Sequence, residues 1–141
     1  MKRLQALRSD SSGSVVIEFA ILAPVLITML FGVLQIGLGM QNYNALRSVA
    51  AQAARYAVVE RQKGTAYAAS DVQNIARTIA TGAPYGLTGT RLTVTCANAT
   101  TQRVTGATEM TLTMSYNVPS FLEIMGMGQI PITFTRPVFV V

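Results

Sequence analysis

Histidine and tryptophan are absent from this 141-residue chain, and cysteine occurs once, as Cys96. A single cysteine cannot form an internal disulfide or a multi-cysteine zinc site. Without histidine, the Ser-His-Asp, Cys-His and His-Glu-x-x-His arrangements are excluded. The 6 acidic residues are scattered, with no paired carboxylates, Gly-rich phosphate loop or metal-ligand spacing among them. We therefore expect a protein that is not an enzyme and that needs no cofactor and no metal.

Charge is also scarce. Charged residues make up 12% of the chain, about half the usual share, whereas hydrophobic residues make up 50%. This balance excludes a disordered charged tail and indicates that part of the chain lies in lipid. The net charge is +5, but the sequence has no run of basic residues, so we expect no nucleic-acid partner.

Residues 19–40 form one apolar run without a charged side chain. A helix of that length spans about 33 Å, enough to cross the hydrocarbon core of a bilayer. A cleaved secretory signal would have a shorter apolar region, of about 7–15 residues, followed by a small-x-small site. The run therefore predicts a transmembrane helix, with the lipid bilayer as its surroundings.

The cations that flank this run bear on its orientation. Lys2, Arg3 and Arg8 precede the run, and Arg47 and Arg55 follow it. An excess of cations on one side favours the cytoplasm for that side. The bias of three against two favours a cytoplasmic N-terminus and an extracytoplasmic C-terminal part.

Two residues before the run suggest more than an anchor. Glu18 lies five residues after Gly13, which follows Ser11 and Ser12 in a small, flexible junction. Glycine lets a protease approach the backbone closely, but it also serves as a simple flexible residue before a helix. An ionisable residue near the membrane tends to mark function. Glu18 could equally be a carboxylate in a helix's first turn, worth about 0.3–1 kcal/mol.

The pattern Gly13-x4-Glu18-Phe19 before an apolar span resembles the processing signature of type IV prepilin-like proteins. The following Ala20 and Pro24, in Glu-Phe-Ala-x3-Pro, resemble the TadE-like family. These are minor pseudopilins of the Tad, or Flp, tight-adherence pilus system. The similarity is concentrated in residues 13–57, and a TadF-like sibling is hard to separate from a TadE-like protein on these motifs.

The resemblance implies that a membrane aspartyl prepilin peptidase cuts after Gly13 and leaves Ser14 as the new N-terminus. Glu18 and Phe19 would serve peptidase recognition and assembly. The implied function is that of a minor pseudopilin needed for assembly of Tad/Flp-type adhesive pili. The implied partners are the prepilin peptidase, an Flp-type major pilin, a sibling TadF-like pseudopilin and the inner-membrane pilus assembly platform. The implied location is the bacterial inner membrane, single-pass with a periplasmic head; whether the protein enters the pilus stays open.

Pro24 lies inside the span. It removes the helix hydrogen bond to the Ala20 carbonyl and so predicts a bend there. The alternative is a tolerated membrane proline without a role, because neighbouring groups in a membrane can satisfy the freed carbonyl.

Helical periodicity continues beyond the membrane. Apolar residues recur at 3- and 4-residue steps, and no proline or glycine follows the span until Gly64. We predict a helix over residues 14–61, about 72 Å long, whose second half projects out of the bilayer. Its alanine-rich part, residues 50–57, is expected to pack against the same chain rather than another subunit.

The rest of the chain predicts one short helix and three strands. Ser70 and Gln73 resemble a capping box with Ser70 as the cap. Alternation with period two predicts half-buried strands over residues 92–96, 110–118 and 130–135. Pro131 favours an edge position for the third strand.

Cys96 falls on the apolar face of the first of these strands, which predicts a buried, inert thiol. Residues 121–127 are predicted to form an apolar loop or short helix. We assign no chemistry to Tyr43, Tyr56 and Tyr67.

These observations predict an α+β, pilin-like fold: a long N-terminal transmembrane helix extending into a small head with a short helix and a three-stranded antiparallel sheet. The domains would be a leader peptide at residues 1–13, a transmembrane helix at 14–40 and an extracytoplasmic head at 41–141, whose first helix continues the span. The alternative function is an uncleaved bitopic membrane anchor with an extracytoplasmic binding head.

Overall fold

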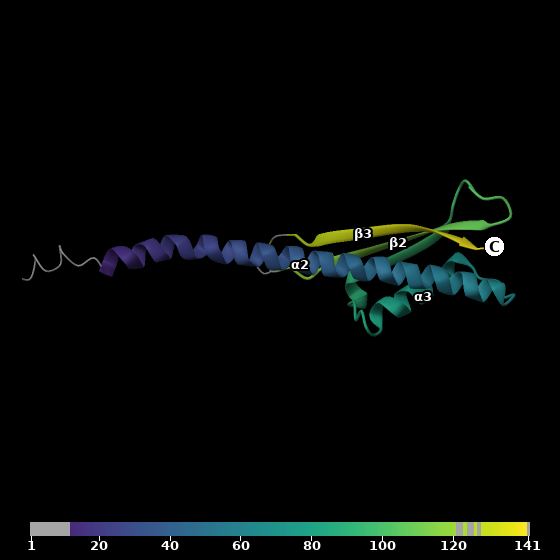
Figure 1. The fold of residues 1–141 in the computed structure, drawn as a ribbon, viewed down its shortest axis with the longest axis horizontal. Helices are drawn as coiled ribbons and strands as arrows, with labels where there is room; N and C mark the ends of the chain where they lie inside the picture. Colours follow the sequence, from purple (N-terminus) through teal and green to yellow (C-terminus); the bar gives the residue numbers. More distant parts are fainter. Residues whose placement is uncertain (1–11, 121–122, 124–125, 127, 141) are drawn as a thin grey trace, which may run out of the picture. The chain divides into compact units, whose positions relative to one another are not determined.

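The computed structural model describes residues 12–120, 123, 126 and 128–140. Its elements are α2 (Ser12–Gln62), α3 (Ala69–Thr81), the 3-10 helix η1 (Gly89–Arg91), β1 (Leu92–Asn98), β2 (Thr108–Val118) and β3 (Ile130–Val140), shown in Figure 1. This is the α+β class that the sequence predicts. The chain divides into two compact units, Met1–Ile36, which we call the N-terminal unit, and Gly37–Val141, which contains the head predicted at residues 41–141.

The long helix α2 matches the predicted helix closely at both ends. It passes through Pro24 and ends at Gln62. Gly64 follows with a φ of 85°, in the left-handed region that favours glycine, and its N–H donates to the Arg61 carbonyl at 2.9 Å. Glycine beyond the last turn is a common way to stop a helix, because it lets the chain turn back onto the last free carbonyls.

The sheet has the strand order β1-β2-β3, and both pairs are antiparallel. Val94 of β1 lies opposite Met114, which lies opposite Phe134 of β3. β3 is therefore an edge strand, as Pro131 predicts. β3 extends to Val140, beyond the predicted end, and includes Pro137. An edge strand accepts a proline whose missing N–H faces away from the neighbouring strand.

The core of the head lies between one face of this sheet and the helices. Alternate residues of the strands face inward, which places the predicted apolar sets on one side. The fully buried side chains include Leu46, Val49, Ala50, Ala53 and Ala57 from α2, Val72, Ala76 and Ala80 from α3, and Leu112, Met114 and Val118 from β2. The expectation that the alanine-rich helix packs within its own chain is confirmed.

The start of α3 differs from the predicted capping box. The N-cap is Ala68, and Ser70 lies inside the first turn. The Asp71 carboxylate accepts a hydrogen bond from the Ala68 N–H at 2.9 Å. This acid in the first turn satisfies the free donor and meets the positive helix end, so the helix begins without a hydroxyl cap.

Candidate functional site

The candidate site begins with Ser14 and Glu18, which share one side of α2. The Ser14 hydroxyl donates a hydrogen bond to the Glu18 carboxylate at 3.3 Å, and both residues are exposed. Residues four apart are neighbours on a helix surface. Because α2 begins at Ser12, its first turn contains no acidic residue. The benefit of a carboxylate at a helix start falls off after the first turn, and the role of Glu18 stays a prediction.

Gly13 lies within the first turn of α2, so its backbone is helical here rather than extended. A Cβ added to Gly13 would meet no atom within 4 Å. Glycine costs about 1 kcal/mol relative to alanine inside a helix. The fold therefore gives no steric reason for glycine at this position. Residues 1–11, with Lys2, Arg3, Arg8 and the rest of the leader, lie outside the described residues.

The surface that follows is apolar throughout. Phe19 is 68% exposed, and the large apolar side chains from Val15 to Ile36 are exposed around the whole helix. Soluble proteins rarely expose so large an apolar surface to water. Within the described residues, α2 is the one helix long and apolar enough to cross a membrane. This apolar N-terminal helix fits a single-pass membrane anchor.

Pro24 sits inside α2 and interrupts its hydrogen-bond pattern. Four residues later, the Thr28 hydroxyl donates to the Pro24 carbonyl at 2.7 Å. Such back-bonding by threonine often accompanies helix bending. The bend at Pro24 stays a prediction.

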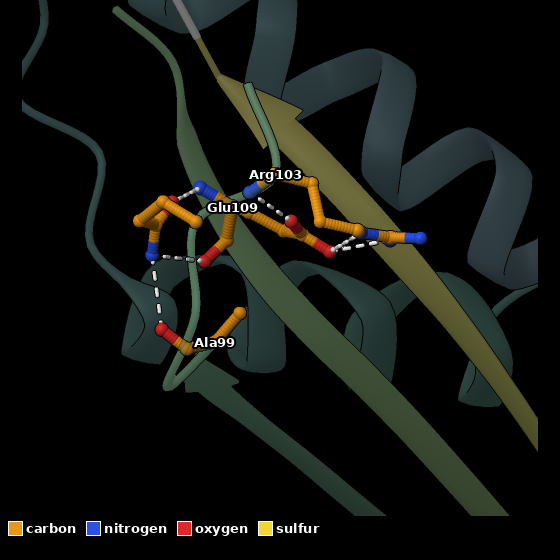
Figure 2. A network of polar contacts seen from close by, with 4 residues as sticks. Ala99, Arg103 and Glu109 are labelled. Carbon is orange, nitrogen blue, oxygen red and sulfur yellow. Dashed lines mark hydrogen bonds and ion pairs between the residues drawn. The ribbon is translucent and has the colours of Figure 1, made fainter. Parts of the chain in front are cut away.

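Polar side chains in the head form a network around Glu109, which is 4% exposed (Figure 2). The Arg103 side chain donates to one carboxylate oxygen of Glu109 through Nε at 2.8 Å, and the Arg103 backbone N–H donates to the other at 3.2 Å. Gln102 Nε2 donates to the carbonyls of Ala99 at 3.0 Å and Glu109 at 3.3 Å. The Arg103 guanidinium also lies 5.3 Å from the centre of the Phe139 ring.

This network closes the turn between β1 and β2. Hydrogen bonding from the Arg103 guanidinium lowers the pKa of the Glu109 carboxyl, although burial opposes that shift. A carboxylate held ionised against an arginine is suited to fixing a turn and unsuited to accepting protons near neutral pH. The sequence did not predict this group of residues. The one indication of it in the sequence is a glutamate, Glu109, at the start of a strand whose other polar positions carry neutral side chains.

A second ion pair holds the connection between β2 and β3. Arg91 donates to both carboxylate oxygens of Glu123, each at 2.9 Å. The pair lowers the pKa of Glu123. Among the residues that the structure describes, no group of three His, Cys, Asp or Glu side chains could hold a metal ion. Of the predicted segment 121–127, residues 121, 122, 124, 125 and 127 lie outside the described residues.

Cys96 is free and half-buried, not fully buried as predicted. It lies at β1, an edge strand, on the side that packs against the core. An edge position leaves one flank of the side chain open. Burial still raises the pKa of the thiol, so its inert character is consistent with its surroundings.

Gly13, Glu18 and the exposed apolar surface all lie in the N-terminal part of α2. Residues 13–55 match the model of the TadE-like protein family. The match confirms the resemblance read from the sequence. It lies entirely within α2 and contains neither α3 nor the sheet. No curated protein and no solved structure matches the chain. The TadE-like family is one of pilus structural components and implies a protein associated with the Tad pilus.

Proposed function

We propose that this chain is a minor pseudopilin, cut after Gly13 by a prepilin peptidase and needed for assembly of Tad/Flp-type adhesive pili. One observation carries the proposal: the TadE-like match begins at Gly13, the residue that precedes the proposed cut. The absence of any steric need for glycine there supports a role in recognition by another protein. Phe19, exposed one turn after the cut, is proposed to take part in that recognition.

Cutting would give Glu18 a partner. The new α-amino group on Ser14 has an ordinary pKa of about 7.7–8.0 and is largely protonated at neutral pH. The side chains of Ser14 and Glu18 already lie within hydrogen-bonding distance. The Ser14 amine could therefore meet this carboxylate, or that of a neighbouring subunit. Such a pair offsets part of the cost of placing Glu18 in an apolar bundle, where an unpaired charge is expensive.

The proposal includes a location and partners. The chain would be a single-pass protein of the bacterial inner membrane, with a cytoplasmic leader at residues 1–13, a span at 14–40 and a periplasmic head at 41–141. It would work with the prepilin peptidase, an Flp-type major pilin, a TadF-like pseudopilin and the assembly platform. A reporter that is active only outside the cytoplasm, fused after Val141, should work. Protection of the head from external protease in spheroplasts would contradict this orientation.

Processing is tested by apparent mass and N-terminal sequencing of the membrane-bound protein, with and without a prepilin peptidase. We expect a loss of residues 1–13 and a new N-terminus at Ser14. Gly13→Leu should block the cut because its side chain fills the space that the protease needs, whereas Gly13→Ala should be affected less. Cleavage of Gly13→Leu at the same bond would contradict the assignment.

The role of Glu18 is tested separately from anchoring. Glu18→Ala should insert and be cut nearly normally, because residues 19–40 suffice as an anchor. It should nevertheless fail to support pili. Ser14→Ala is the matched control, since it keeps the new α-amine and removes only the hydroxyl. Wild-type piliation by Glu18→Ala at equal protein levels would rule out the pairing.

One observation favours the alternative of an uncleaved bitopic anchor with a binding head. Gly13 and Ser14 are helical in this structure, whereas a protease binds extended backbone. Cleavage therefore requires the first turn of α2 to open, which helix ends do readily. The mass assay separates the two functions, because the uncleaved anchor shows no shift when the peptidase is present.

A further inference from the structure

β3 is an edge strand in which every second residue points its backbone groups out of the sheet. The Glu109 carbonyl accepts a hydrogen bond from the Ala99 N–H at 2.8 Å, on the side of β2 that faces β1. Glu109 therefore forms no ladder hydrogen bond with Phe139, which lies opposite it in β3. The register continues without a bulge, so alternate residues from Phe139 back to Pro131 have the same orientation. Pro131 and Pro137 both belong to this outward set, as prolines in an edge strand must.

The outward set leaves backbone groups free for another strand. The N–H groups of Thr133, Thr135 and Phe139 face away from β2, as do the carbonyls of all the outward residues. Among the described residues, no backbone group outside the sheet hydrogen-bonds to β3. Such an edge is a template for an added strand. The prolines shorten this template but do not remove it, because Thr133 and Thr135 lie between them.

A cleft of about 270 Å³ lies beside this edge, between α2 and β3. It is lined by one side of α2, from Ala51 to Val58, and by residues 136–139 of β3. Most of the lining is apolar, and its charged residues are Arg55 and Arg136. Both arginines are exposed, and neither forms an ion pair with a described residue. The cleft therefore presents two positive charges without counterions next to free backbone groups.

The head has no side-chain carboxylate to spare for these arginines. Residues 41–141 contain 8 Lys or Arg and 4 Asp or Glu side chains. Glu60, Glu109 and Glu123 are already in ion pairs, and Asp71 accepts a hydrogen bond at the start of α3. A second copy of the head would thus bring cations to cations. With the proposed span ending at residue 40, Arg55 lies about 22 Å farther along the helix, beyond the lipid headgroups.

We propose that β3 accepts an extended, acidic segment of another protein as a fourth strand of the sheet. The backbone of the segment pairs with the outward groups of Thr133, Thr135 and Phe139. An Asp or Glu side chain of the segment enters the cleft and meets Arg55 and Arg136. Backbone pairing supplies the affinity, and the carboxylate selects the partner and its register. The inference goes beyond the proposed pilus role and does not depend on cleavage.

Peptide binding to the detergent-solubilised full chain, followed by fluorescence anisotropy, tests the proposal. The probe is a labelled Thr-Val-Glu-Val-Glu-Val-Thr peptide. One control peptide carries Lys in place of each Glu, and a second keeps both carboxylates but is methylated at every internal backbone nitrogen. The first control loses the attraction to the arginines, and the second loses its backbone donors. We expect the probe to bind at least about 10-fold more tightly than either control.

Substitutions in the chain separate the two parts of the contact. Thr135→Pro removes one outward N–H and should weaken binding of the probe by about 3- to 10-fold. The fold should tolerate it, because prolines already occupy two equivalent positions in β3. Thr135→Val is the matched control, since it removes the hydroxyl and keeps the N–H. Arg55→Gln and Arg136→Gln should each weaken binding by about 2- to 5-fold, whereas Arg77→Gln, on α3, should leave it unchanged.

Amide hydrogen exchange locates the bound peptide. Exchange at Thr133, Thr135 and Phe139 should slow when the probe is added, whereas exchange at Val94 and Cys96, in the opposite edge strand β1, should not change. No binding of the probe, equal binding of the three peptides, or full binding by Thr135→Pro would overturn the proposal. So would a chain whose mass in light scattering shows that two copies pair through this edge. None of these results alters the mass assay for cleavage.

Discussion

The two stretches of α2 both carry apolar side chains but have opposite exposure. Leu34 in the N-terminal unit is 46% exposed, whereas Leu46 in the head is 0% exposed. Backbone conformation does not distinguish them, because both belong to one continuous helix. What differs is the surface available to cover each side chain: the head supplies its own sheet, whereas the N-terminal stretch requires lipid or other helices. Exposure therefore identifies the surroundings for which each stretch is suited.

Side-chain size follows the same division. The part of α2 in the head presents alanines to the core, at Ala50, Ala53, Ala54 and Ala57. The N-terminal stretch carries mostly leucine, isoleucine, valine and phenylalanine on every side, which is typical of a lipid-facing surface. Alanines on one face thus mark the part of α2 that packs within the head. Bulky apolar residues on every side mark the part that is suited to lipid.

The largest change in stability is expected at Leu46. Leu46→Ala should lower the free energy of unfolding of the head by about 2–5 kcal/mol, because it removes buried contacts and leaves a cavity. Leu34→Ala, the matched change in the exposed stretch, should alter it by about 0.5 kcal/mol or less. Urea denaturation of the detergent-solubilised full chain, followed by tyrosine circular dichroism, measures both. Equal effects of the two substitutions would mean that the difference in exposure does not determine how much each leucine contributes to stability.

A smaller effect is expected when the core face of α2 is enlarged. Ala53→Leu should destabilise the head by about 1–3 kcal/mol, because the fully buried methyl leaves no room for a larger side chain. Ala51 lies nearby on the same helix but is only half-buried, so Ala51→Leu should cost clearly less. The same urea titration compares them. A stable Ala53→Leu head would mean that the sheet can move away from the helix.

Periodicity made most of this division predictable. The 3- and 4-residue steps along α2 and the alternation in the strands follow directly from which side chains face the core, so the sequence predicts them well. The cap of α3 was missed because an acid in its first turn replaces the expected hydroxyl. The Glu109 network was missed because Gln102, Arg103 and Glu109 meet only when the β1–β2 turn closes. In the candidate site, the sequence locates Gly13 and Glu18, but their roles depend on other proteins and stay predictions.

Acid should lower the free energy of unfolding of the head, and part of this loss should depend on Arg103. Because Arg103 lowers the pKa of Glu109, the ionised carboxylate stabilises the fold above the ordinary carboxyl pKa of about 4.3. That stability is lost as the pH falls through the lowered native pKa. Arg103→Gln should therefore lower the urea midpoint at neutral pH and reduce its further decline in acid.

The control for this prediction is Lys63→Gln, which breaks the exposed pair between Lys63 and Glu60 at the end of α2. Exposed pairs contribute little to stability, so its profile should follow the wild type. Part of the acid dependence should remain in Arg103→Gln, because Arg91 also lowers the pKa of Glu123. An Arg103→Gln profile that coincides with the wild type at every pH would contradict the structural role of the network.

The smallest change in stability is expected at Cys96. Alkylation of cysteines distinguishes a side chain that is protected by the fold from one that is protected by lipid. Burial raises the pKa of this thiol, so less of the reactive thiolate is present at about pH 8 than for a free cysteine. Alkylation of the native chain should therefore be slow and should become fast in urea.

A cysteine in the lipid-facing stretch provides the comparison. In a chain that carries Cys96→Ser and Ile21→Cys, the new cysteine should be shielded in membranes. It should become reactive once detergent opens the bilayer, with no need for urea. Cys96→Ser itself should change stability by about 1 kcal/mol or less, since the side chain is half-buried and similar in size. Equal alkylation rates for Cys96 in the native and urea-unfolded chain would show that the head does not protect it.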